Sequence, residues 1–327
     1  MNDSPADERR DRHRGCLLGL AVGDALGTTL EFRPPGTFRP LTDLVGGGPF
    51  GLAPGQWTDD TSMALCLAES LLARGGFDAR DQMDRYVRWW REGYLSSTGV
   101  CFDIGGTVSG ALRRFLADEE RRPGAGDPFA GYTDPRTAGN GSLMRLAPVP
   151  LFFARHGAAE AIAQAGESSR PTHGAPAAVD ACRYMAGLIL GALAGASKEL
   201  LIAPAFAPAG AEDIWTREPL AEPVAVVAAG SFLTREPPRI RGTGYVVDSL
   251  EAALWAFARS EDFESGALLA VNLGDDADTT GAVYGQLAGA FYGEGGIPGR
   301  WLERLHQRKC IGGLADKLLG TDGETAG

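Results

Sequence analysis

The feature that most constrains the fold of this chain is the recurrence of helix-spaced apolar segments. Residues 63–73, 175–196, 250–258 and 279–292 each repeat apolar side chains at intervals of three and four, which is the periodicity of a helix with one buried face. Runs of β-branched residues that would indicate strands are few, and alternating strand and helix units are missing. The sequence therefore predicts an all-α fold.

Small residues recur inside two of these predicted helices at a spacing of four: Gly187, Gly191, Gly195, Gly281, Gly285 and Gly289. Glycine in a helix interior costs about 1 kcal/mol relative to alanine, so these positions require a compensating interaction. Close approach of neighbouring helices would supply it. A general enrichment of the chain in glycine and alanine is the alternative explanation.

Two segments rich in proline and glycine interrupt the helical pattern, at residues 34–55 and 203–244. Helical segments flank both of them, so we interpret them as long loops within one domain, and loops of this length are usually functional or mobile. The predicted domain spans residues 15–320, between a flexible N-terminal tail, residues 1–14, and a C-terminal tail, residues 321–327.

The charge balance limits the classes of partner. Lys and Arg number 31 and Asp and Glu number 42, a formal net charge of −11, so the whole molecule does not attract nucleic-acid phosphates or anionic lipids. The apolar stretch 15–29 is shorter than the roughly 20 residues that span a bilayer, and Asp24 interrupts it. The five cysteines are scattered without metal-ligand spacing, which favours a reducing cytoplasmic location over a disulfide scaffold or structural zinc.

Two acidic clusters each directly precede a predicted helix. Residues 55–61 read GQWTDDT and residues 274–280 read GDDADTT. Threonine and aspartate are common helix caps, and carboxylates in a first turn interact favourably with the helix dipole. Together, however, the two clusters exceed what capping requires, and carboxylates with hydroxyls are the ligands that Mg²⁺ and Mn²⁺ prefer.

Four motifs in order resemble the ADP-ribosylglycohydrolase family. They are GLAVGDALG at 19–27 with Glu31 after it, WTDDT at 57–61, GNGSLMR at 139–145 and GDDADT at 274–279. The chain is similar more narrowly to the bacterial dinitrogenase-reductase-activating glycohydrolase branch. The resemblance extends from residue 15 to about residue 293, nearly the whole chain.

This resemblance implies an orthogonal multi-helix bundle with two divalent cations, Mg²⁺ or Mn²⁺, in a central cleft. It implies hydrolysis of the glycosidic bond at the anomeric carbon of the distal ribose of ADP-ribose. The implied metal ligands are Thr58, Asp59, Asp60, Asp276, Asp278 and Thr279. The implied catalytic carboxylates are Glu31, Asp60 and Asp103, and the implied substrate contacts are Thr137, Gly139, Asn140, Gly141, His173 and Tyr245. Asp275 is left out of the ligand set, because many family members have glycine there.

Several of these residues have plainer alternatives. Glu31 could be a solvent-facing glutamate at a helix end, since Glu is commonly exposed, and Asp103 could cap a helix. The loop 137–141, whose backbone amides are expected to receive the pyrophosphate, could be a simple turn, because Asn-Gly favours turns. His173 could make a structural hydrogen bond, and Tyr245, expected to stack on adenine, could pack in the core.

Three functions follow from this interpretation. The first is a metal-dependent ADP-ribosyl hydrolase that acts on a modified protein, nucleic acid or small conjugate and releases ADP-ribose. The second is another two-metal hydrolase, such as a phosphatase, and the third is a non-catalytic ADP-ribose-binding or toxin-immunity protein. Because all six ligands are present, catalysis is favoured. The acceptor, arginine, serine, a base or a small molecule, stays open, and a monomer is the default expectation.

Overall fold

The computed structural model describes residues 4–320, and the regular structure in this range is helical, with three isolated β-bridges. The α-helices are α1 Pro5–Gly27, α2 Asp59–Arg74, α3 Ala79–Glu92, α4 Gly106–Arg121, α5 Pro148–Phe153, α6 Ala158–Ser169, α7 Pro176–Leu193, α8 Lys198–Leu201, α9 Ile214–Arg217, α10 Glu222–Ala228, α11 Ser231–Thr234, α12 Val246–Arg259, α13 Phe263–Val271, α14 Ala277–Tyr292, α15 Gly299–Arg304 and α16 Arg308–Leu319. Short 3₁₀ turns lie at Thr28–Leu30, Pro135–Thr137, Ala154–His156 and Glu294–Gly296. The predicted all-α fold is confirmed.

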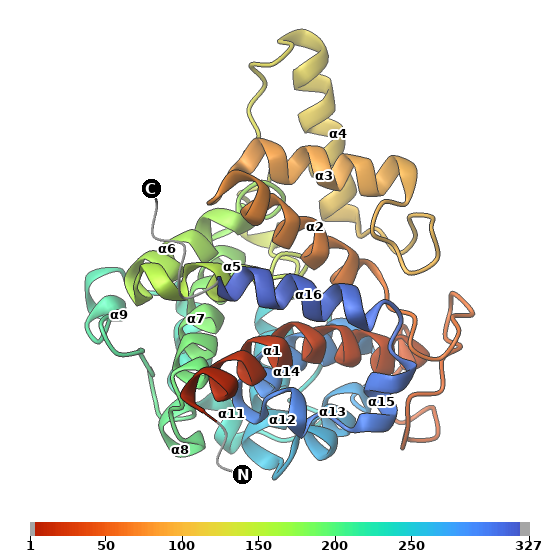
Figure 1. Ribbon diagram of the computed structural model, residues 1–327, viewed down its shortest axis with the longest axis vertical. Coiled ribbons are helices and arrows are strands. Elements are labelled where there is room, and N and C mark those ends of the chain that lie inside the picture. Colours follow the sequence, from red (N-terminus) through yellow and green to blue (C-terminus); the bar gives the residue numbers. More distant parts are fainter. Residues whose placement is uncertain (1–3, 321–327) are drawn as a thin grey trace.

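The pair α1 and α14 lies side by side at the centre of the molecule (Figure 1). Their contact is a seam of glycines: Gly15, Gly19 and Gly23 on α1 meet Gly289, Gly285 and Gly281 on α14. A Cβ atom on any of the six would overlap a carbonyl oxygen of the opposite helix. The predicted close helix–helix approach is therefore confirmed for the second glycine set, and its partner is the first apolar segment of the chain. This seam brings the C-terminal end of α1 beside the N-terminal end of α14.

The glycines of α7 serve a different purpose from the one predicted. A Cβ atom on Gly187 would lie 3.4 Å from the ring of Trp215, and one on Gly191 would crowd the ring of Phe206. Gly195 lies beyond the helix, with a φ of +80°. The prediction of close helix–helix approach is wrong here, because these positions leave room for aromatic side chains from α9 and from the loop before it.

Helix α7 is long and apolar enough by composition to cross a membrane, and no other helix in residues 4–320 meets that criterion. However, 78% of the apolar window is buried inside the molecule. It packs against α6, α14 and α12, as a core helix does.

The prediction of a flexible N-terminal tail at residues 1–14 is wrong for residues 5–14, which form the first turns of α1. Ser4 and Asp7 make a reciprocal capping box at the helix start, a motif that satisfies two otherwise unpaired backbone donors. Farther along, Arg10 pairs with Asp316 at 2.7 Å. These charged residues are ordered by partners 300 positions away, which local composition cannot reveal. Residues 1–3 and the predicted C-terminal tail, 321–327, lie outside the described residues.

The two proline-rich segments differ. Residues 34–55 form a loop without helix, as predicted. Residues 203–244, predicted to be a loop throughout, contain α9, α10 and α11. Pro223 lies in the first turn of α10, where the missing N–H has no intrahelical acceptor and proline is well tolerated.

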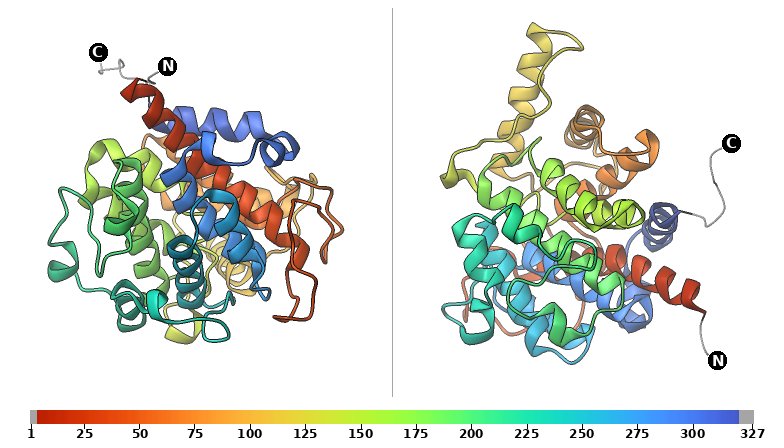
Figure 2. Two further views of the ribbon diagram at one scale, coloured as in Figure 1. Left: turned by 90° about the horizontal axis from the view of Figure 1, so that it is seen from below. Right: turned by 90° about the vertical axis from the view of Figure 1, so that its left-hand side faces the viewer.

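Helix α4 and the segment after it project away from the rest of the molecule (Figures 1 and 2).

Candidate active site

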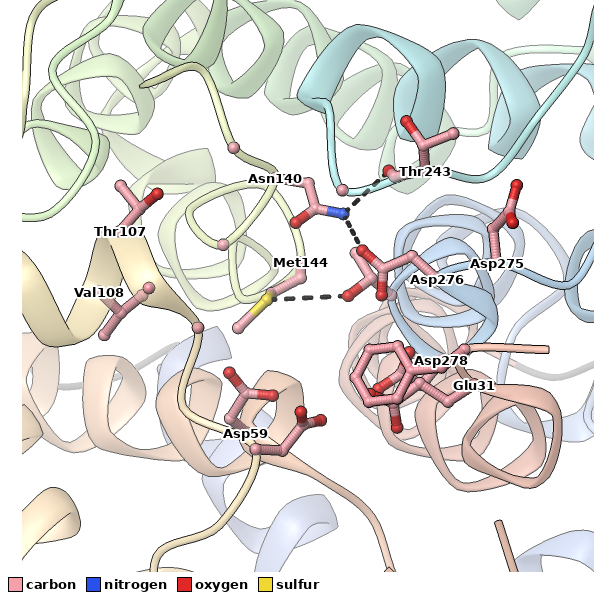
Figure 3. A pocket seen from close by; sticks show the side chains of 18 of the residues that line it. Glu31, Asp59, Thr107, Val108, Asn140, Met144, Thr243, Asp275, Asp276 and Asp278 are labelled. Atoms are coloured by element: carbon pink, nitrogen blue, oxygen red, sulfur yellow. Dashed lines mark hydrogen bonds between the residues drawn. The ribbon is translucent and has the colours of Figure 1, made fainter. Parts of the chain in front are cut away.

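A cavity of about 520 Å³ opens where the ends of four helices meet. The segment after α1, the N-terminal ends of α2, α4 and α14, and two connecting loops contribute its walls (Figure 3). Its lining includes ten residues predicted for the site: Glu31, Asp59, Asp103, Gly139, Asn140, Gly141, His173, Asp276, Asp278 and Thr279. Thr58 and Asp60 lie fully buried directly behind this lining, whereas Thr137 and Tyr245 do not line the cavity.

The first acidic cluster does not act as a helix cap. Thr58 is the N-cap residue of α2, but its side chain makes no capping hydrogen bond. Its hydroxyl lies 2.9 Å from Asp24 Oδ1 and 3.2 Å from Asp278 Oδ2. The side chain thus joins α2 to α1 and α14 rather than closing its own helix.

Asp24, which lies inside the first motif but was given no role in the prediction, caps α2 from the neighbouring helix. Its carboxylate accepts from the backbone N–H groups of Thr58 and Thr61, at 2.8 and 3.0 Å, and from both threonine hydroxyls. Burial raises the pKa of Asp24 to about 6, and these hydrogen bonds oppose the rise. A carboxylate within an apolar helix was the sequence signal, because an unpaired charge is rarely buried.

The second acidic cluster interlocks with the first. The hydroxyl of Thr279 donates to Asp60 Oδ1 at 3.3 Å, and Asn140 Nδ2 donates to Asp276 Oδ2 at 2.7 Å (Figure 3). Asp276 is the N-cap residue of α14 and likewise makes no side-chain capping bond. Two motifs more than 200 residues apart therefore form one polar cluster.

Burial and mutual repulsion disfavour the charged state of these carboxyl groups. Burial raises the pKa values of Asp59, Asp60 and Asp278 well above the usual range, and their acidic neighbours add to the rise. The pKa of Asp276 is raised as well, chiefly by burial. Among the described residues that line the cavity, Arg241 is the one cationic side chain, and it already pairs with Asp275 at 2.8 Å. The cluster therefore lacks positive charge.

Three buried carboxyl oxygens have no hydrogen-bond partner within residues 4–320: Glu31 Oε2, Asp60 Oδ2 and Asp278 Oδ1. Buried polar atoms without a partner are costly and rare in native proteins. Oxygens of Glu31, Asp103 and Asp278 also lie within 4.8 Å of one another. Since every donor in the cluster is oxygen, the residues present fit hard divalent cations.

Glu31 is buried at 3% exposure, so the alternative of a solvent-facing helix-end glutamate is wrong. Burial and then the nearby Asp103 raise its pKa to about 10. The 3₁₀ turn Thr28–Leu30 continues α1 and ends at Glu31, which lines the cavity together with Asp59, Asp103 and Asp278.

Asp103 is not a helix cap either, because Gly105 is the N-cap residue of α4. Asp103 has a φ of +58°, a conformation that Asp and Asn tolerate better than most residues. A carboxyl oxygen of Asp103 lies within 4.8 Å of oxygens of Glu31 and Asp278, and burial raises the pKa of Asp103 to about 7.

The glycine loop differs in part from its prediction. Backbone N–H groups of Gly139 and Asn140 donate to the carbonyls of Thr137 and Gly244, so they are not open to a pyrophosphate in this conformation. The Thr137 hydroxyl donates to the carbonyl of Asp134. Residues 141–145 after the loop form a turn and not a helix. The loop nevertheless lines the cavity through its glycines and Asn140.

His173 is buried against this loop. A Cβ atom on Gly141 would lie 2.8 Å from the imidazole ring, so glycine is required for the ring to sit there. Its Nδ1 lies 2.8 Å from the Thr172 hydroxyl, which accepts from Arg145. Burial lowers the pKa of His173 to about 3, which keeps the ring neutral and makes it a hydrogen-bonding group rather than a proton donor. Tyr245 is 38% exposed, so the core-packing alternative does not hold.

Comparison with known proteins agrees with this architecture. The sequence model of the family described as ADP-ribosylglycohydrolase matches residues 5–326. The chain is 45% identical to ADP-ribosylarginine hydrolase Tri1 of Pseudomonas putida and 42% identical to that of Serratia proteamaculans, covering 96% of this chain and 79% and 81% of theirs. It is 34% identical to the ADP-ribosyl-[dinitrogen reductase] glycohydrolase of Rhodospirillum rubrum, over 96% of this chain and 97% of that one.

A solved structure, described as an ADP-ribosylglycohydrolase-related protein complex, is also similar. It superposes with a TM-score of 0.81 at 48% identity, covering 96% of this chain and 98% of that chain.

Proposed function

The chain belongs to the ADP-ribosylglycohydrolase family and is a hydrolase that cleaves glycosyl linkages of ADP-ribose, and we propose that it releases ADP-ribose from arginine side chains of modified proteins. The arginine acceptor is supported by the names of the relatives at 42% and 45% identity. Five free cysteines support a reducing, cytoplasmic setting, and the enzyme is proposed to act as a monomer.

The single observation that carries the proposal is the set of unpartnered, buried carboxyl oxygens on Glu31, Asp60 and Asp278. In this proposal two divalent cations, Mg²⁺ or Mn²⁺, are held by Thr58, Asp59, Asp60, Asp276, Asp278 and Thr279. Such cations, when bound, polarise a water molecule and orient substrate oxygens. Asn140 holds the Asp276 carboxylate in place through its 2.7 Å hydrogen bond.

The chain's own residues supply proton transfer and positioning. Glu31 lies beside Asp103 and Asp278 in the cavity, where a carboxyl group can donate a proton to a leaving nitrogen. Asp103 lies against it and can exchange a proton with it. Asp60 completes the proposed carboxylate set, in line with the use of carboxyl pairs by other glycosidases.

The remaining predicted contacts are proposed to bind the ADP-ribose moiety. Gly139, Asn140, Gly141 and the neutral imidazole of His173 form one wall of the cavity. Thr137 and Tyr245 lie just outside the lining. They are proposed to contact the nucleotide where it leaves the cavity, and Tyr245 has the exposed ring that stacking on adenine needs.

The test is release of ADP-ribose from a panel of substrates in Mg²⁺ or Mn²⁺: an arginine-modified protein, a serine-modified peptide and O-acetyl-ADP-ribose. We expect release from the arginine linkage, and loss of that release in Asp278→Asn. Asp213→Asn is the matched control, since the Asp213 side chain is 67% exposed on α9's flank. Release from another linkage with none from arginine would overturn the proposed acceptor, and full activity of Asp278→Asn would overturn the proposed site.

A further inference from the structure

Phe32 is an exposed aromatic residue at the mouth of the acidic cavity. It follows Glu31 directly and lines the same cavity. Its side chain is 65% exposed, more than any other large apolar side chain in residues 4–320. Because this ring lines the cavity, it is in a position to contact a ligand that enters there.

The backbone holds Phe32 in this position at a conformational cost. Its φ is +60°, in the left-handed region that bulky residues avoid. The N–H of Phe32 donates to the carbonyl of Asp275 at 2.7 Å, and the N–H of Asp275 donates to the carbonyl of Arg33 at 2.8 Å. Asp275 is itself left-handed, with a φ of +54°. Strain that the surroundings enforce in this way is concentrated at functional sites.

Two further rings connect Phe32 to the residue that precedes Asp103. Phe50 meets Phe32 edge-on, with ring centroids 6.5 Å apart and an interplanar angle of 73°, and it packs on Phe102 at 5.1 Å. Phe32 follows Glu31 and Phe102 precedes Asp103, the two acids whose oxygens approach within 4.8 Å. The aromatic cluster Phe32–Phe50–Phe102 thus stands beside the acid pair, and its most exposed member is Phe32.

An aromatic face next to buried carboxylates is a binding surface for a planar cation. The π-system attracts the cation through its quadrupole, and guanidinium groups stack on rings more readily than ammonium groups do. We propose that Phe32 determines acceptor specificity by contacting the guanidinium of the ADP-ribosylated arginine at the mouth of the cavity. This inference rests on the proposed function and names a residue that distinguishes a guanidinium from a neutral acceptor.

The test compares Phe32→Leu and Phe32→Trp with the wild-type enzyme in Mg²⁺. Leucine keeps apolar area but has no aromatic face, whereas tryptophan offers the strongest one. For each protein we would measure kcat/KM on an arginine-modified peptide, and the inhibition constant of O-acetyl-ADP-ribose as a competing ligand with a neutral acceptor. Phe129→Leu is the matched control, because Phe129 is 43% exposed, pairs with Phe77 at 6.5 Å and does not line the cavity.

We expect Phe32→Leu to lower kcat/KM on the arginine linkage by about 3- to 30-fold. In Phe32→Leu the inhibition constant of O-acetyl-ADP-ribose should stay within about twofold of the wild-type value. Phe32→Trp should keep the wild-type kcat/KM on the arginine linkage. Phe129→Leu should change neither quantity. Wild-type kcat/KM in Phe32→Leu would overturn this inference alone, and so would equal losses for both ligands or an equal loss in Phe129→Leu. A wild-type enzyme inactive on the arginine linkage would overturn the proposed function, and this inference with it.

Discussion

Asp103→Asn should stabilise the metal-free protein at alkaline pH, and the structure gives the size of the effect. Burial raises the pKa of Asp103 from 3.8 to about 7. Asparagine has the same shape, does not titrate and tolerates the left-handed φ of +58° found there. The substitution therefore removes a buried charge without a change in volume or backbone strain.

The direction of the pH dependence follows from proton linkage. Below about pH 4 the carboxyl group is protonated in both the folded and the unfolded chain, and folding has no penalty. Between about pH 4 and 7 the unfolded chain ionises first, so wild-type stability falls as the pH rises. Above pH 7 the loss is complete. At 1.36 kcal/mol per pKa unit it amounts to about 4 kcal/mol.

The expected gain for Asp103→Asn at pH 8 in EDTA is about 2–4 kcal/mol, because the variant also changes the interaction with the neighbouring Glu31 carboxyl group. For a chain of 327 residues this corresponds to a rise in Tm of about 3–6 °C. Thermal unfolding by circular dichroism at pH 8 and at pH 4, each in EDTA, measures it, with the exposed Asp213→Asn as the control. A variant that melts at or below the wild-type Tm at pH 8 would refute the argument that these carboxyl groups are destabilising without a cation.

Three other predictions follow from the same structure. Glu31→Gln keeps size and hydrogen bonding but not the titrating proton, so hydrolysis should fall by about 10²–10⁴ while the Kd of ADP-ribose by calorimetry stays within a few-fold; wild-type turnover would remove Glu31 from the mechanism. Gly285→Ala places a methyl group against the Gly19 carbonyl and should lower the free energy of unfolding by about 1–3 kcal/mol, as measured in urea. An unchanged midpoint of unfolding would contradict the close contact between α1 and α14. Mn²⁺ should raise Tm more at pH 8 than at pH 5, because protons compete with the cation for the carboxylates; an equal rise at both pH values would argue against binding at these groups.

The sequence predicted those helices whose apolar residues recur at helical spacing within a short segment. Helices α2, α12 and α14 repeat apolar residues at helical spacing, so the pattern was sufficient, although the structure buries them on nearly all sides. The first turns of α1 are polar and depend on distant partners such as Asp316, so they were mistaken for a tail. Helix α10 was missed because proline was taken as a breaker, although at a first turn it is compatible with helix.

The acidic cluster was predictable where its members are adjacent residues in a motif. The glycine seam aligns α14, which carries Asp276 and Asp278, with α1. Asp24 of α1 binds the start of α2, which carries Asp59 and Asp60, and no local pattern in the sequence indicates either contact. The role of Asp24 as a cap for another helix depends on that tertiary contact.

The cavity rim was harder to predict than the cluster. The Arg241–Asp275 pair and the backbone bonds that orient Phe32 join segments far apart in the chain. Neither has a sequence signature, because an isolated arginine and an isolated phenylalanine are ordinary residues. Only their arrangement around the carboxylates gives them significance.

The central claim is that the buried carboxylates form a divalent-cation centre that the hydrolase requires. The most direct measurement is ADP-ribose release from an arginine-modified protein by enzyme stripped of metal and then titrated with Mn²⁺, with metal content per chain determined at each point by mass spectrometry. The account predicts no release from the stripped protein and a rate that rises with bound metal to a maximum at two ions per chain. Full turnover by protein containing no bound metal would contradict it.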